Sequence, residues 1–188
     1  MGDCLAALTI MARMRCQRIA PLAGLTLALA GCAPALDWRE LRPPGSGATL
    51  TWPCKPHGLV RPVVLAGQAL NLTLHACAAG GQTWGLAFAD VADPARVGPV
   101  LDALRRAAAA NIGATAPGQS RPLQVPGATP NAASGRVRLA GNLPTGEAMQ
   151  MEVAVFSRGT VAFQATVLGK QVAEDPLETF ISSIRFAP

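Results

Sequence analysis

Short stretches in which apolar and polar residues alternate restrict the fold of this 188-residue chain more than any other feature. Leucine occupies every second position from 70 to 74, and the large side chains Trp84, Leu86 and Phe88 follow the same spacing. Successive side chains of a strand point to opposite faces, so each stretch is predicted to be a strand. Seven such strands are expected: Thr49–Cys54, Arg61–Ala66, Leu70–His75, Thr83–Ala89, Gly135–Leu139, Met149–Ser157 and Thr160–Leu168. A weaker pattern leaves a further short strand open at Leu123–Val125.

Two amphipathic helices are predicted among these strands. The first begins at Asp93-Pro94, an N-cap followed by a first-turn proline, and Gly113 is well placed to end it. Its apolar stripe consists of Val97, Val100, Leu101, Leu104, Ala108 and Ile112. The second begins at Asp175–Glu178, which has the pattern of a capping box, and its stripe consists of Leu177, Phe180, Ile181 and Ile184. One short helical turn is also expected at Asp37–Leu41.

The order of these elements predicts an α+β fold. Turn signals at Gly80-Gly81 and Arg158-Gly159 are typical of hairpins, which join antiparallel strands directly. We therefore expect an antiparallel sheet of about six or seven strands backed by two main helices. Small residues share one face of the strand near residue 85, where a helix is expected to pack closely: Gly85, Ala87 and Ala89. Half of the residues are apolar and 14% are charged, a composition suited to a packed core and unlike that of a disordered chain.

The first 31 residues have the layout of a secretory signal peptide. Three arginines between positions 13 and 18 lead into an apolar segment, Ile19–Gly31. That segment is shorter than the roughly 20 residues that a spanning helix needs, so a membrane-spanning anchor is the weaker alternative. Three methionines are compatible with the start of translation: Met1, Met11 and Met14.

The leader ends in Leu29-Ala30-Gly31-Cys32, which resembles the lipobox of bacterial lipoproteins. In that family the cysteine is S-acylated, the leader is cut before it and the new amino group is acylated. The resemblance implies that acyl chains on Cys32 anchor the protein in a membrane. An aspartate after the cysteine tends to retain these proteins in the inner membrane, and Ala33 stands there instead, which implies the outer membrane, facing the periplasm. An ordinary signal peptide with Cys32 as a bystander is the alternative.

Proline, glycine and serine are frequent after the lipobox, up to residue 48. This composition predicts a flexible tether between the anchor and the folded part. The expected organisation is therefore a leader at 1–31, a lipidated cysteine with its tether at 32–48 and a single α+β domain at 49–188.

Only Cys54 and Cys77 remain once the leader and Cys32 are accounted for. Two thiols in an oxidising compartment are a candidate disulfide. A metal pair or a redox-active pair fits less well, because there is no CxxC spacing and the chain has two histidines. Strand alternation places Cys54 with Trp52 but Cys77 with a polar set that includes His75, so the sequence leaves the pairing open.

The element order, with a closing Phe180–Phe186 helix after an alternating hairpin, resembles the PsbP-like proteins. These include extrinsic photosystem proteins and many uncharacterised bacterial lipoproteins. The resemblance covers roughly residues 49–188 and implies an α/β/α sandwich built on an antiparallel sheet. Members act mostly as binding or assembly factors, so it implies a role of that kind and carries over no catalytic residue.

The sequence contains no GxSxG, SxxK, HExxH, P-loop or GxGxxG motif, all of which are patterns typical of catalytic, metal or cofactor sites. We therefore predict no catalytic residue, no metal ligand and no cofactor. The mature chain would carry 13 basic and 10 acidic residues, a net charge of +3. The basic residues are dispersed, which argues against nucleic acid as a partner.

Three functions stay open. The leading one is a lipid-anchored periplasmic module that binds or helps to assemble an envelope protein partner. The second is a carrier of a small ligand, with an apolar cavity beneath the small residues from Gly85 to Ala89. The third is an envelope hydrolase that uses His75, expected on a solvated strand face, as its acid or base.

Overall fold

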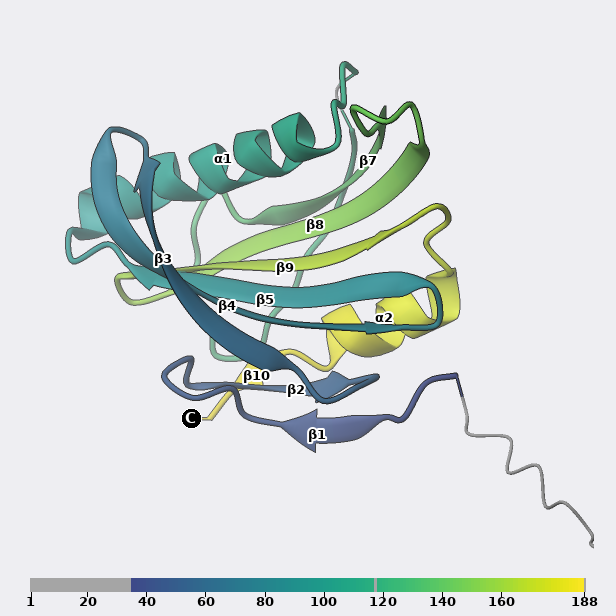
Figure 1. Ribbon diagram of the computed structural model, residues 1–188. Helices are drawn as coiled ribbons and strands as arrows, with labels where there is room; N and C mark the ends of the chain where they lie inside the picture. The colour runs from purple at the N-terminus through teal and green to yellow at the C-terminus, as the bar shows by residue number, and fades with distance from the viewer. Residues whose placement is uncertain (1–34, 117, 188) are drawn as a thin grey trace, which may run out of the picture. The chain divides into compact units, whose positions relative to one another are not determined.

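The computed structural model describes residues 35–116 and 118–187, which contain two antiparallel sheets and two helices (Figure 1). The larger sheet has seven strands in the order β3-β4-β5-β9-β8-β7-β6. They are β3 (His57–Leu65), β4 (Gln68–Ala79), β5 (Gln82–Asp90), β6 (Gln119–Arg121), β7 (Gly135–Asn142), β8 (Ala148–Arg158) and β9 (Val161–Gly169). The smaller sheet has the order β1-β2-β10, with β1 (Arg39–Leu41), β2 (Ala48–Trp52) and β10 (Arg185–Phe186). Cys32 lies outside the described residues.

Both faces of the large sheet are covered, which confirms the α+β sheet backed by helices. Helix α1 (Pro94–Asn111) packs on one face, where its apolar stripe meets Val137, Val153 and Val155. Helix α2 (Glu174–Ser182) and the small sheet pack on the other face, around Trp84 and Phe163. Figure 1 shows α1 and α2 on opposite sides of the strands. The large sheet is thus the middle layer between two hydrophobic cores.

Helix α1 follows its sequence signals closely. The side chain of Asp93 accepts a hydrogen bond from the backbone N–H of Ala95 at 2.9 Å, which satisfies one of the free donors of the first turn. Gly113 follows the end of the helix with a φ of +59°, a conformation that glycine adopts without steric cost. Both the start and the end of this helix are therefore confirmed.

The capping box predicted for α2 is wrong. The helix begins at Glu174, its N-cap residue is Ala173, and no side chain caps it. Asp175 lies inside the first turn instead of before it, and Glu178 pairs with Arg136 on the sheet. Glu178 therefore forms an ion pair with Arg136 of the large sheet and does not cap the helix.

Three short segments also differ from expectation. Arg39–Leu41, expected as a turn of helix within the tether, is strand β1 and pairs with β2, so the fold begins before residue 49. The strand left open at 123–125 forms instead at Gln119–Arg121, as β6. The closing helix stops at Ser182, and Arg185–Phe186 pairs with Thr49 and Ala48 as β10. In each case pairing with a distant strand overrides the local pattern.

Cys54 and Cys77 form a disulfide, with their Cα atoms 6.0 Å apart. The bond joins the chain just after β2 to the middle layer at β4. The sequence left this pairing open because Cys77 shares a face with polar residues. The structure shows that this face of β4 turns toward the small sheet, since Cys77 lies opposite the buried Trp84 of β5.

Replacing both Cys54 and Cys77 by serine should lower the free energy of unfolding by about 3 kcal/mol, because the bond closes a loop between positions 23 residues apart. Chemical denaturation of the oxidised protein and the double variant measures this difference. Reduction should destabilise the parent protein by a similar amount and leave the variant unchanged. Equal stability of the parent with and without reductant would contradict the prediction.

Candidate functional site

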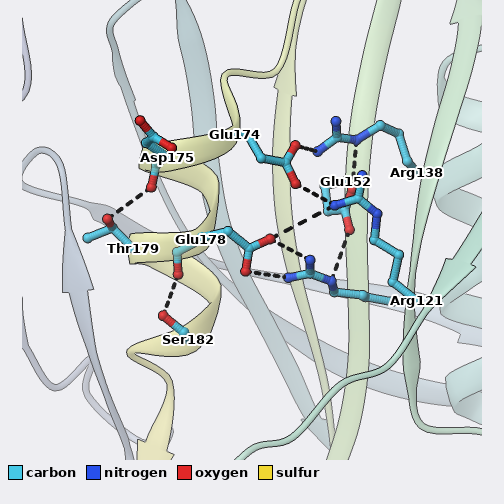
Figure 2. A network of polar contacts seen from close by, with 9 residues as sticks. Arg121, Arg138, Glu152, Glu174, Asp175, Glu178, Thr179 and Ser182 are labelled. Carbon is cyan, nitrogen blue, oxygen red and sulfur yellow. Dashed lines mark hydrogen bonds and ion pairs between the residues drawn. The ribbon is translucent and has the colours of Figure 1, made fainter.

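The most extensive polar cluster of the described residues lies between α2 and the β6–β8 end of the large sheet (Figure 2). Its centre is Glu152 on β8, whose side chain is fully buried. Arg138 lies directly opposite on β7, and its Nε donates to Glu152 Oε2 at 2.9 Å. Arg136, two residues earlier, brings its Nε to 3.4 Å from Glu152 Oε1, an ion-pair contact without hydrogen-bond alignment. One buried carboxylate is thus shared by two guanidinium groups.

Helix α2 supplies two further carboxylates to this cluster. Glu174 accepts from Arg121 at 2.5 Å and lies 2.9 Å from Arg138, while Glu178 pairs with Arg136. The hydrogen bond from Arg121 holds the pKa of Glu174 below its usual value, and the hydrogen bond to Glu178 raises the pKa of Arg136. In Figure 2 both glutamates point from the helix toward the arginines of the sheet.

The charges of this cluster balance, with three arginines facing three glutamates. Each charged group already has a partner of opposite sign, so the cluster holds no charge in reserve for a ligand. Its ion pairs instead fix the rotation of α2 about its own axis and the position of α2 along the sheet. We therefore interpret it as a structural lock between two layers.

Glu152→Gln should cost about 3 kcal/mol of stability, because two largely buried guanidinium groups lose the charge between them. The matched control is Glu147→Gln, which removes an exposed carboxylate paired with Lys170 and should change stability far less, because solvent screens exposed ion pairs. Denaturant unfolding of the two variants and the parent measures both values. Similar small losses for both would show that the buried carboxylate has no structural role.

The expectation that His75 lies on a solvated face is wrong. Its side chain is buried and stacks on Phe88 with ring centroids 6.1 Å apart. The backbone of Gly58 on β3 covers it so closely that a Cβ on Gly58 would lie 2.8 Å from the ring. No carboxylate hydrogen-bonds to the ring among the described residues, and Nε2 has no partner there. A histidine enclosed in this way cannot reach a substrate as acid or base.

The ligand cavity expected beneath Gly85, Ala87 and Ala89 is also wrong in its position. Thr166 Oγ1 and Leu74 Cδ1 would lie 2.9 and 3.7 Å from a Cβ on Gly85, so neighbouring side chains fill that space. Ala87 and Ala89 are buried. Gly85 thus packs against side chains of the neighbouring strands β4 and β9, which leave no room for a ligand beneath it.

A cavity of about 440 Å³ does lie at another place, between the second half of α1 and β7. Val137 and Leu139 form part of its apolar wall, and Arg105 and Arg106 stand at its rim. Arg105 is held by Asp102 and by the carbonyl of Ala133, at 3.2 and 2.6 Å. Arg106 is exposed and makes no ion pair with any described residue. The cavity combines an apolar wall with one available positive charge.

The edge strand β3 is the main feature that the sequence did not reveal. The described domain exposes three large apolar side chains, all on this strand: Leu59, Val60 and Val64, at 41, 61 and 73%. From sequence alone Arg61–Ala66 is expected as an ordinary strand, and its composition does not show whether its faces are covered. The position of β3 at the end of the sheet, which only the topology shows, leaves both faces exposed over most of its length.

Metal ligands are not gathered anywhere in the described part of the chain, where no group of three or more His, Cys, Asp or Glu side chains could hold an ion. Comparison with protein-family models finds no match, and comparison with curated proteins finds no similar one.

Proposed function

We propose that this protein is a lipid-anchored module of the cell envelope that binds a protein partner. Acyl chains on Cys32 hold it to the outer membrane, and the domain faces the periplasm. The leader and the lipobox-like end at Cys32 support the anchor. The disulfide between Cys54 and Cys77 supports an oxidising compartment, because such bonds persist there and are rare in the cytoplasm. Within the described residues no helix is long and apolar enough to cross a membrane.

The exposed apolar edge strand β3 is the observation that favours protein binding. Proteins usually protect the edges of their sheets, because a free edge can pair with another chain. Here the long edge exposes Val60 and Val64 to solvent on either side of Arg61 and Pro62. Exposed apolar side chains gathered on one strand favour an interaction site. The buried position of His75 removes the basis for the hydrolase alternative.

One experiment on intact cells tests both the anchor and the partner. A photo-crosslinking residue replaces Val64 on β3 or, as the matched control, the exposed Ala110 on α1. The protein extracted from the membrane without irradiation should have the mass of residues 32–188 plus acyl groups, with two cysteines that are alkylated only after reduction. An unprocessed or unacylated mass would contradict the anchor.

After irradiation, the variant at position 64 should give one discrete adduct with an envelope protein, and the variant at position 110 should not. The physical reason is that only the β3 position lies on the exposed apolar edge. The same set of abundant proteins captured at both positions would contradict a specific partner on this edge.

The cavity beside α1 favours a second candidate function, a carrier of a small ligand. An apolar wall with a free arginine at the rim suits an amphipathic carboxylate, whose tail would lie on Val137 and whose head would pair with Arg106. A fluorescent medium-chain fatty acid should bind the parent protein. Its affinity for the Arg106→Glu variant should be at least fivefold lower. Its affinity for the control variant Arg96→Glu, on the first turns of α1, should equal that of the parent. Unaltered binding by Arg106→Glu would remove the cavity as the site.

A further inference from the structure

We infer that β3 binds an extended segment of the partner as an eighth strand of the large sheet, and that an acidic side chain of that segment pairs with Arg61. This inference rests on the proposed function, since it names how the partner binds.

β3 is the one long open edge among the described strands. At the opposite end of the large sheet β6 has three residues, whereas β3 has nine, and β3 pairs on one side with β4 over its whole length. The edge strands of the small sheet, β1 and β10, have three and two residues. Only β3 offers enough backbone to hold an added strand.

Pro62 shows which backbone groups of β3 face outward. It lies opposite Asn71 of β4. In a hydrogen-bonded antiparallel pair both residues donate an N–H, and proline has none, so this pair is of the non-hydrogen-bonded kind. The carbonyl of Pro62 therefore points away from β4. Because the pattern alternates, the N–H and carbonyl groups of Gly58, Val60 and Val64 point outward as well.

The residues of β3 whose backbone groups point outward offer an added strand both hydrogen bonds and apolar contact. Val60 and Val64 present free N–H and carbonyl groups at the edge, and they are also the two most exposed large apolar side chains. Main-chain bonds supply affinity in strand addition, and alternate side chains supply specificity. Pro62 removes one donor from the middle of the edge, which limits indiscriminate pairing.

A second copy of this chain does not suit the edge in the antiparallel register that pairs all nine residues. If two β3 strands paired antiparallel over their full length, His57 would lie opposite Leu65 and Arg61, the central residue, would lie opposite its own copy. Like charges directly opposite each other are destabilising. The same register would place Pro62, without its donor, at two central positions.

Arg61 instead selects an acidic segment. It is exposed, and none of the described carboxylates forms an ion pair with it. Its side chain projects from the face opposite to that of Val60, because neighbours in a strand alternate. A segment that alternates apolar residues with glutamate or aspartate would therefore match both faces of β3.

The test uses the detergent-extracted full chain and two ten-residue peptides, one alternating Val with Glu and the other Val with Lys. Amide hydrogen exchange is measured residue by residue. Without peptide, the amides of Val60 and Val64 should exchange rapidly, and those of Arg61 and Val63 slowly. The Glu peptide should slow exchange at Val60 and Val64 at least tenfold, and the Lys peptide should not.

Two variants with a matched control distinguish strand addition from non-specific apolar binding. Val64→Pro removes an outward donor without removing a bond to β4, and it should weaken Glu-peptide binding at least tenfold. Val64→Thr keeps that donor and should weaken binding less than threefold. Arg61→Glu should reverse the preference, so that the Lys peptide binds and the Glu peptide does not. Circular dichroism confirms that each variant is folded.

Several results would overturn the inference. One is that neither peptide slows amide exchange on β3. Another is that both peptides slow it equally and Arg61→Glu leaves this unchanged. A third is that slowed exchange is confined to residues outside β3. Protection without peptide, together with a dimer mass, would show that a second copy occupies the edge. A crosslinked partner at position 64 combined with failure of both peptides would overturn only strand addition and leave the proposed function standing.

Discussion

The pairing of β5 with β9 holds the two halves of this domain together. The first half is a meander, β3-β4-β5, and the second is another, β9-β8-β7-β6. Their junction runs from Gln82 opposite Gly169 to Asp90 opposite Val161, nine pairs without interruption. Because β5 and β9 lie in the middle of the sheet, their side chains are buried on both faces, and each hydrophobic core needs residues from both halves. Neither meander could bury its faces alone.

The sequence predicts the strands of this sheet well and its edges poorly. Six of its seven strands are predicted, most of them by alternation, because a half-buried strand shows its two faces in its composition. The seventh, β6, was expected at 123–125 instead of Gln119–Arg121, and the expected strand at 49–54 belongs to the small sheet. Alternation could not show how far a strand continues past its apolar core, so β3 begins at His57, four residues before the expected start. It also could not tell which face of β4 the small sheet covers, and for this reason the burial of His75 and the environment of Cys77 were missed.

The polar cluster shows the same limit. Arg136 and Arg138 alternate with Val137 and Leu139, as in a strand with one solvated face. Three arginines and three glutamates from four elements meet there instead, with Glu152 fully buried. Each charge is acceptable in this place only because the others are present. Such mutual dependence is a property of the assembled layers, and no single segment of sequence contains it.

The disulfide also makes the stability of the fold depend on the redox conditions around it. It fastens β2 to β4 and so closes one side of the core that contains Trp52 and Trp84. Under reducing conditions this bond does not persist, so the reduced chain resists unfolding less than the oxidised one. The same domain therefore has two levels of stability, and the thiol–disulfide balance of its surroundings decides between them.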